Sequence, residues 1–76
     1  MLHELEIVVL TRDLDVGGLK KGGVGTIVHC YSGGKGFEVE FITGDGRTVA
    51  VATLDSVDIR RMKEGEILHA REITTV

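Results

Sequence analysis

The sequence has a single cysteine, Cys30, and contains neither proline nor tryptophan. One cysteine cannot form a disulfide within the chain, so we expect a fold that does not depend on an oxidising compartment. Two Phe and one Tyr are the only large aromatic residues among 76. The core must therefore come from Val, Ile and Leu, whose branched side chains favour strands. A chain of this length makes one small domain.

Long apolar runs and an excess of basic charge are also lacking. No run approaches the roughly 18 apolar residues of a membrane span, and the first residues lack the basic start of a signal peptide. We therefore expect a cytoplasmic protein without membrane contact. Nine Lys and Arg are outnumbered by twelve Asp and Glu, giving a net charge of −3. Because Lys and Arg supply most of the non-specific affinity for phosphate backbones, this balance disfavours nucleic acid as the partner.

What the sequence does have is a series of glycine-rich turns between short alternating strands. Strands are expected over residues 5–10, 24–31, 37–42, 47–53 and 57–61, and an Asp-Gly pair at 45–46 favours a hairpin. A long polar loop over 11–18 precedes the second strand, and residues 54–56 form a helical turn before the last core strand. This order predicts an all-β, mostly antiparallel, five- or six-stranded SH3-like barrel over residues 1–61.

Residues 62–76 form a C-terminal extension, which is either an edge strand or a short helix, because periodicity does not separate the two at this length. The extension carries Ile67, Leu68 and Ile73. An unpaired sheet edge is a template for another strand, so this extension predicts a homo-oligomer.

Alternation of apolar and polar residues predicts which side chains point inward. In the third strand Phe37, Val39 and Phe41 alternate with Glu38 and Glu40, which then point outward. The predicted core over all strands is Ile7, Val9, Val24, Val28, Val39, Phe41, Val49, Val51 and Ile59.

The residues that suggest catalysis or metal binding do not form a constellation. His29 and Cys30 are neighbours on a strand, so they point to opposite faces, Cys30 inward and His29 outward. A structural zinc site needs four ligands, commonly in close pairs. No serine or cysteine has the nearby base or positive charge that activates a nucleophile. We therefore expect no metal, no cofactor and no enzymatic activity.

An acidic surface is the feature that remains. Glu38 and Glu40 share one face of the third strand, and Asp13 and Asp15 lie in the long loop before the second strand. If that loop lies over the sheet, the four carboxylates form one patch. Complementary charge speeds encounter and fixes register, so such a patch predicts a basic protein partner. The alternative is an acidic surface that serves solubility alone.

Several motifs recur in the order typical of one family. They are Val8-Val9-Leu10-Thr11-Arg12-Asp13, Gly18-Leu19-Lys20-Lys21-Gly22, Val24-Gly25-Thr26-Ile27-Val28, Tyr31, Gly33-Gly34, Phe37-Glu38-Val39-Glu40-Phe41, Asp45-Gly46-Arg47-Thr48 and Asp58-Ile59-Arg60. The block from Ile7 to Arg61 thereby resembles the small bacterial proteins of domain of unknown function four-nine-two-six. Gly23 stands where an acidic residue is common in that pattern.

The resemblance implies an SH3-like fold and a compact partner encoded beside a larger, in some cases nuclease-like, protein. It brings no catalytic motif. The implied function is that of an antitoxin-like, immunity-like or regulatory protein-binding module. The implied partner is a protein encoded nearby.

A second stretch, from Lys21 to Ile27, resembles the KOW motif of ribosomal and transcription-elongation proteins. That resemblance implies a module that binds RNA or the transcription and translation machinery through Lys20, Lys21, Arg60 and Arg61. The two functions differ in the sign of the charge they use. Only the RNA-binding function predicts an affinity that falls steeply with salt.

Overall fold

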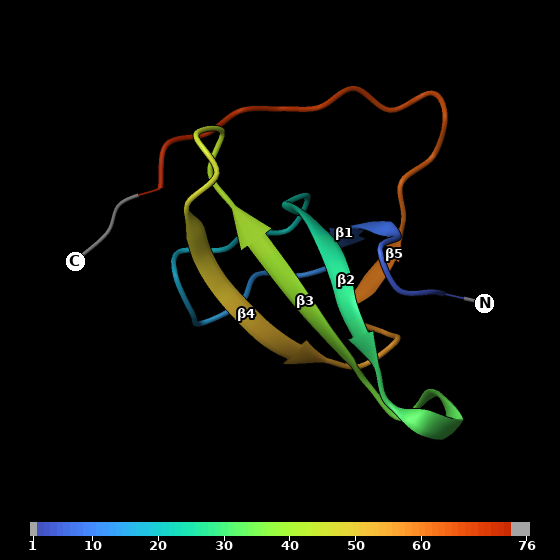
Figure 1. Ribbon diagram of the computed structural model, residues 1–76. Coiled ribbons are helices and arrows are strands. Elements are labelled where there is room, and N and C mark those ends of the chain that lie inside the picture. Colours follow the sequence, from blue (N-terminus) through green and yellow to red (C-terminus); the bar gives the residue numbers. More distant parts are fainter. Residues whose placement is uncertain (1, 74–76) are drawn as a thin grey trace.

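Five short strands make up the sheet of this protein. The computed structural model describes residues 2–73 and contains β1 (Ile7–Leu10), β2 (Val24–Cys30), β3 (Phe37–Ile42), β4 (Thr48–Leu54), β5 (Ile59–Arg61) and one 3-10 turn, η1 (Ser32–Gly34). The strands form one antiparallel sheet in the order β4-β3-β2-β1-β5 (Figure 1). The predicted all-β class is confirmed. Within residues 2–73 no ladder joins the edge strands β4 and β5, so closure into an SH3-like barrel stays a prediction.

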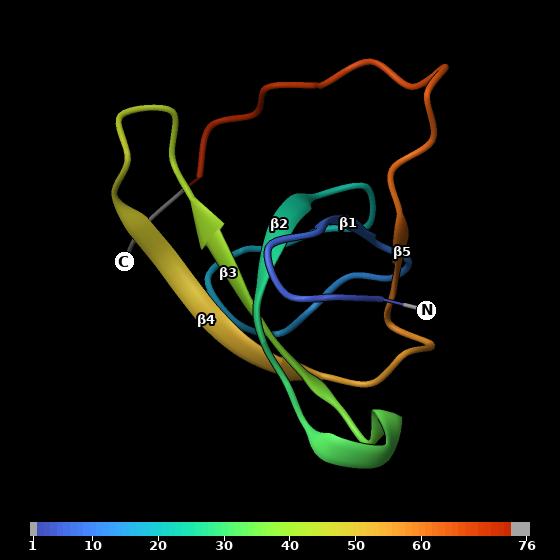
Figure 2. The same ribbon diagram turned by 45° about the vertical axis from the view of Figure 1, so that its right-hand side comes forward.

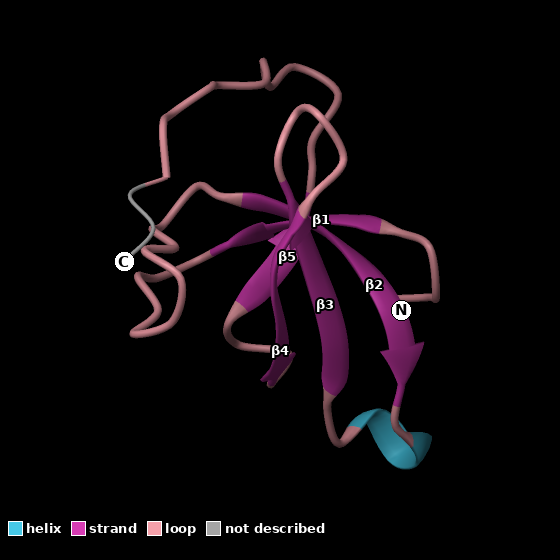
Figure 3. Ribbon diagram, turned by 60° about the vertical axis from the view of Figure 1, so that its left-hand side comes forward, coloured by secondary structure: helices cyan, strands magenta, loops and turns pink. Residues whose placement is uncertain are grey.

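The glycine turns produce the expected hairpins. At the β3–β4 turn the Thr43 N–H donates to the Arg47 carbonyl at 2.8 Å, and Gly46 adopts a φ of 88°. The connection from β4 to β5 is a single turn in which the Asp58 N–H donates to the Asp55 carbonyl at 2.9 Å. Two long segments have no regular structure, the loop between β1 and β2 and the segment after β5 (Figure 3). No helix in the described part of the chain is long and apolar enough to cross a membrane.

The segment after β5, residues 62–73, is neither an edge strand nor a helix, so this expectation is wrong for the described residues; residues 74–76 lie outside them. The Arg60 guanidinium donates to both Glu66 oxygens at 2.7 and 2.5 Å, and the Lys63 N–H donates to the same carboxylate at 2.6 Å. This tight turn directs the chain away from β5 and so prevents a regular continuation. The segment then crosses to the β3–β4 turn (Figure 2). Its Arg71 side chain donates to the carbonyl of Gly18, in the loop between β1 and β2, at 2.7 Å.

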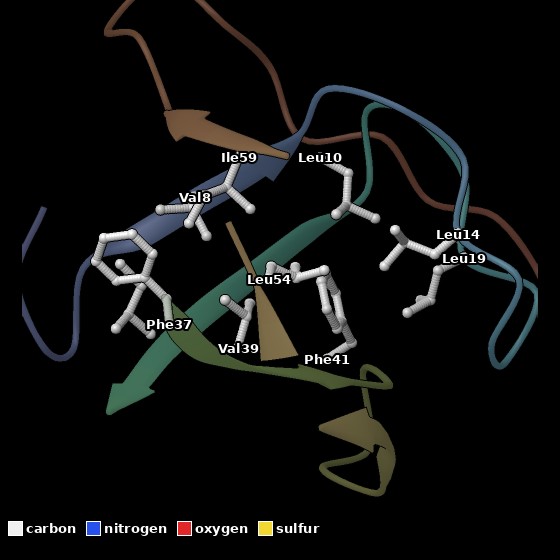
Figure 4. Packing of buried hydrophobic residues seen from close by; sticks show 10 residues of the cluster. Val8, Leu10, Leu14, Leu19, Phe37, Val39, Phe41, Leu54 and Ile59 are labelled. Carbon is white, nitrogen blue, oxygen red and sulfur yellow. The ribbon is translucent and has the colours of Figure 1, made fainter. Parts of the chain in front are cut away.

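The core lies on one face of the curved sheet and includes two leucines of the first loop. Its ten buried hydrophobic residues are Val8, Leu10, Leu14, Leu19, Ile27, Phe37, Val39, Phe41, Leu54 and Ile59 (Figure 4). The three inward residues predicted for β3 are all among them. Because loop residues reach this face, the long loop covers the core side of the sheet.

One residue of β2 interrupts the alternation. Ile27 pairs with Val39, and the next pair along the ladder joins His29 to Glu38, so Val28 has no partner in β3. This is a β-bulge, in which one strand has an extra residue. Ile27 is fully buried, whereas Val28 is 40% exposed. The inward orientation predicted for Val28 is wrong because strict alternation does not hold across the bulge.

The predicted orientation of β1 is also wrong. Val8 and Leu10 are buried in the core, and Ile7 is 51% exposed on the opposite face. Val9 is buried as well, at 4% exposed, but it shares the face of Ile7. Val9 pairs with Arg60 of β5, whose ion pair with Glu66 lies on that face. Burial of Val9 therefore comes from the opposite side of the sheet to the core.

In β4 the two alanines pack against the core together with the buried Leu54. Val51 is 52% exposed, which makes its predicted core position wrong. Its neighbour Ala52 pairs with Val39 and packs against the core. Val49 also packs against the core but is only partly buried. The inward orientation predicted for Val24 in β2 is wrong, because Val24 pairs with Val9 and so lies on the same face of the sheet as Val9, opposite the core.

Asp58 links the β4–β5 turn to the first loop through hydrogen bonds. It is the only polar or charged residue that is buried between residues 2 and 73, at 7% exposed. One carboxylate oxygen accepts from Arg12 Nε at 2.6 Å, and the other accepts from the Asp55 N–H at 3.0 Å. The Asp58 carbonyl accepts from the Thr11 N–H at 2.9 Å. The Arg12 hydrogen bond, followed by that from Asp55, lowers the pKa of Asp58 below its ordinary 3.8.

We expect Asp58→Ala to lower the free energy of unfolding at neutral pH by about 1–3 kcal/mol, because it leaves the partners of a buried carboxylate unbonded. Arg12→Ala should cost less, since the Arg12 side chain is 58% exposed. The folded-state pKa of Asp58 is depressed, so its contribution is present above pH 3.8 and disappears as the pH falls through the folded value. Urea unfolding of both variants over a pH series measures this. A variant at Asp58 as stable as the wild type would contradict the role.

Candidate protein-binding surface

The face of the sheet opposite the core, the outer face, carries polar and apolar side chains side by side. Its residues are Ile7, Thr26, His29, Glu38, Glu40, Ile42, Thr48, Val51 and Thr53. One cross-strand row runs from Val51 through Glu40 and Thr26 to Ile7. Side chains directly opposite one another in such a row lie close enough to interact. The outer face is therefore one continuous surface across β4, β3, β2 and β1.

Glu38 and Glu40 lie at the centre of this surface, as predicted for their strand. The Thr48 hydroxyl donates to Glu40 Oε2 at 2.7 Å, and the Thr53 hydroxyl donates to Glu38. Neither carboxylate has a salt-bridge partner in residues 2–73, and β2, β3 and β4 contain no Lys or Arg. The two carboxylates are thus bonded to neutral donors and not to cations.

An aromatic pair borders the two carboxylates. The Tyr31 and His29 rings meet edge to face, with centroids 4.7 Å apart and an interplanar angle of 81°. Tyr31 is 43% exposed. Partial burial and the negative charge of the neighbouring Glu38 raise the pKa of Tyr31. Sequence reasoning did not select Tyr31 as a site residue, although a lone tyrosine beside an acidic strand is the signal that points to it.

Three exposed aliphatic side chains flank the carboxylates. Ile7, Val51 and Ile42 are 51%, 52% and 57% exposed. Two of them, Ile7 and Val51, belonged to the predicted core, so the error in strand orientation also concealed the apolar part of the surface. Isolated exposed aliphatics are ordinary, whereas contiguous apolar patches rimmed by polar residues mark interaction sites.

The loop carboxylates do not join this surface. The Asp13 carboxylate accepts from the Lys21 N–H at 2.8 Å and lies 4.0 Å from the Lys20 ammonium. Next to it in the chain, Leu14 is buried in the core, which lies on the other side of β3 from Glu38. Asp15 is exposed in the same loop. The single four-carboxylate patch predicted from the sequence is therefore not formed, because the loop folds over the core side.

The four basic residues of the RNA-binding alternative are scattered and mostly paired. Arg60 is bonded to Glu66, and Arg61 to Glu6. Consecutive residues on a strand point to opposite faces, so these two arginines do not act together. Each ion pair reduces the positive charge that a phosphate would meet. Lys20 lies close to Asp13, as described above, and Lys21 is exposed in the turn before β2.

A pocket of about 970 Å³ lies between that turn and the C-terminal segment. Its lining comes from the turn before β2, the β3–β4 turn and residues 68–73, and it includes Lys20, Lys21, Arg47 and Arg71. Arg47 is 3.7 Å from the Asp45 carboxylate. The pocket is lined partly by the irregular segment and does not reach Glu38 or Glu40.

His29 and Cys30 take the predicted orientations. His29 is exposed and its Nδ1 lies 3.8 Å from the Glu4 carboxylate. Cys30 is partly buried and packs against the core. Residues 2–73 contain no group of three or more His, Cys, Asp or Glu side chains placed to hold a metal ion. The side chains of His29 and Cys30 therefore lie on opposite faces of the sheet and do not form a common site.

Comparison with protein families shows what the chain is similar to. Residues 4–61 match the family described as Domain of unknown function (DUF4926). Neither a curated protein nor a solved structure matches the chain. The matched segment includes every strand and the whole outer face, and it ends at Arg61, the last residue of β5. Because the match covers well over half of the 76 residues, the chain belongs to the DUF4926 family.

Proposed function

We propose that this protein is a non-catalytic protein-binding module, the small antitoxin-like, immunity-like or regulatory partner of a larger, nuclease-like protein encoded nearby. The outer face supports this proposal most directly. It presents two carboxylates without salt-bridge partners in the described residues, a half-exposed tyrosine and three half-exposed aliphatic side chains. Tyrosine and apolar side chains anchor protein interfaces, while charge sets the encounter rate and the register.

The arrangement of the carboxylates suits binding better than catalysis. Each is bonded to the hydroxyl of a threonine directly or nearly opposite on β4, so its geometry is set before a partner arrives. Preorganised side chains lose little conformational freedom on binding. A general acid needs an environment that perturbs its pKa, usually a cleft. The pocket described above lies elsewhere, beside the C-terminal segment.

Charge also favours a basic protein over RNA as the partner. A nuclease must carry positive charge to bind its substrate, and an acidic face is complementary to such a surface. The alternative, a KOW-like module that binds RNA, relies on Lys20, Lys21, Arg60 and Arg61. Three of these four lie beside a carboxylate, which weakens that alternative.

The proposal predicts that reversing both outer-face charges abolishes binding. We expect the double variant Glu38→Lys, Glu40→Lys to lose about 100-fold or more in affinity for the protein encoded by the neighbouring reading frame, because like-charge contacts cost several kcal/mol and 1.4 kcal/mol is tenfold. Co-expression followed by titration calorimetry of the purified pair measures the affinity. Circular dichroism checks that the variant keeps its sheet.

The matched control is Glu64→Lys, Glu72→Lys, which changes the net charge equally on exposed residues of the C-terminal segment. It should bind like the wild type apart from a modest, salt-sensitive change in association rate. Equal losses in both double variants would show that net charge, not the outer face, controls binding. Retention of RNA at physiological salt without binding to the neighbour would replace the proposal by the KOW-like alternative.

A further inference from the structure

The two edges of the sheet differ in how they are protected. The β5 edge has three residues, and two of them, Arg60 and Arg61, are engaged with Glu66 and Glu6. The chain then turns away at Lys63. Short length and charge are two of the usual ways in which proteins prevent an edge from pairing with another chain. The β5 edge is therefore closed to a further strand.

The β4 edge has neither protection. It has seven residues, Thr48–Leu54, and none is charged or proline. Within residues 2–73 its backbone forms a ladder with β3 alone, and the other side of the strand has no hydrogen-bonded neighbour. Both views of the ribbon place β4 at the outside of the sheet (Figures 1 and 2). Val51, in the middle of the strand, is half exposed. The first loop contacts the start of the strand, where a Cβ on Gly17 would lie 3.2 Å from Val49 Cγ1, but it does not pair with the strand.

We propose that β4 pairs antiparallel with β4 of a second copy of this chain, joining two five-stranded sheets into one. This inference goes beyond the proposed function and does not depend on it. A second copy is favoured over a charged partner strand because β4 brings no charge to complement. Antiparallel pairing of identical strands is two-fold symmetric, so each copy contributes the same residues and the assembly closes at two.

The outer-face carboxylates do not oppose this dimer. Glu40 lies on β3, one strand away from the edge, so the two Glu40 positions are separated by three strand spacings, or about 14 Å. That distance exceeds the Debye length of roughly 8 Å at physiological salt, which leaves little repulsion. The threonine hydroxyls of β4 that bond Glu38 and Glu40 come from the same copy, so pairing does not disturb them.

Two lysine substitutions test the interface without removing buried groups. Val51 lies opposite Glu40 and Thr53 opposite Glu38, so Val51→Lys and Thr53→Lys each place a cation beside a carboxylate of their own molecule. Cross-strand pairs of opposite charge support the sheet. A lysine on an edge blocks strand addition. Both variants should therefore fold and fail to pair.

Sedimentation equilibrium at high micromolar protein should give the wild type twice the 8.2 kDa chain mass and each lysine variant a twofold lower mass. Circular dichroism should be the same for all three. The control is Leu68→Lys, which charges an exposed aliphatic residue of the C-terminal segment, 73% exposed against 52% for Val51, and should stay dimeric. A monomeric wild type would overturn the proposal. So would a dimer that survives both β4 substitutions, or one lost through Leu68→Lys alone, which would assign self-association to the C-terminal extension.

Discussion

Replacing Gly25 with alanine is expected to destabilise the fold by about 3 kcal/mol or more, the upper end of what overpacking costs. Gly25 lies in β2, where the backbone approaches the side chains of β3. A Cβ there would meet Val39 Cγ1 at 2.7 Å, Phe41 Cε1 at 2.8 Å and the Glu40 carbonyl oxygen at 3.0 Å. Both side chains belong to the closely packed core, and the carbonyl belongs to a paired strand. None of the three can move without disturbing its own neighbours.

Such a loss is a large fraction of the total free energy of unfolding of the domain. At about 0.05 to 0.15 kcal/mol per residue, a domain of this size has roughly 4 to 11 kcal/mol of stability. The control is Gly44→Ala in the β3–β4 turn, where an added Cβ meets nothing within 4 Å and the backbone is not left-handed. That change should stay within about 0.5 kcal/mol of wild type. Urea unfolding followed by circular dichroism compares the two. Equal effects would show that β2 does not approach β3 so closely.

The second large effect is expected at Ile27. Ile27→Ala should cost about 2–5 kcal/mol, because it removes a fully buried side chain and leaves a cavity. The adjacent Val28→Ala should cost far less, below about 1 kcal/mol, since its side chain is 40% exposed at the bulge. Strict alternation with Val28 inward predicts the reverse order. The pair of variants therefore measures the orientation of β2 directly.

Chemical denaturation of both variants under identical conditions gives the comparison. Similar denaturant slopes for the two would show that the difference is one of stability rather than of compactness. A larger loss at Val28 than at Ile27 would refute the bulge and support an uninterrupted β2.

The predictability of this fold depends on which strand is considered. The orientation of β3 follows from its sequence, because Glu38 and Glu40 can only be accommodated facing away from the core. In β1, Val8, Val9 and Leu10 are all apolar, and a run of this kind indicates burial on both faces rather than alternation. On the second face Val9 lies beside Arg60 of β5, which is paired with Glu66 of the C-terminal segment. That contact lies far along the chain and has no local signal.

In β4 the sequence alternates valine with alanine, and size favours valine inside. The structure has the opposite orientation because β3 fills the space beside the middle of β4 with Val39 and Phe41. Ala52 lies opposite Val39 and Ala50 opposite Phe41, so large side chains of β3 are matched there by small ones of β4, whereas at the end of the strand Leu54 lies opposite Phe37. Complementarity between strands decides this orientation, and it cannot be obtained from either strand alone.

In the candidate site, too, some positions follow from a single strand and others depend on the rest of the fold. Glu38 and Glu40 lie where the sequence places them, since their positions depend on one strand. Asp13 and Asp15 do not join them, because the path of a loop depends on its buried leucines rather than on its charges. Tyr31 reaches the surface through the alternation that follows the bulge.

The bulge in β2 also determines at which position this strand can lose one residue. Val28 is an extra residue in the ladder, so removing it would leave Ile27 facing inward and His29 facing outward, as they do now. Removing any other single residue between Thr26 and Cys30 would require the bulge to move or the side chains that follow to exchange faces. When sequences of this family are aligned, a one-residue gap belongs at Val28. An alignment that places it elsewhere in β2 would equate a core position with a surface one.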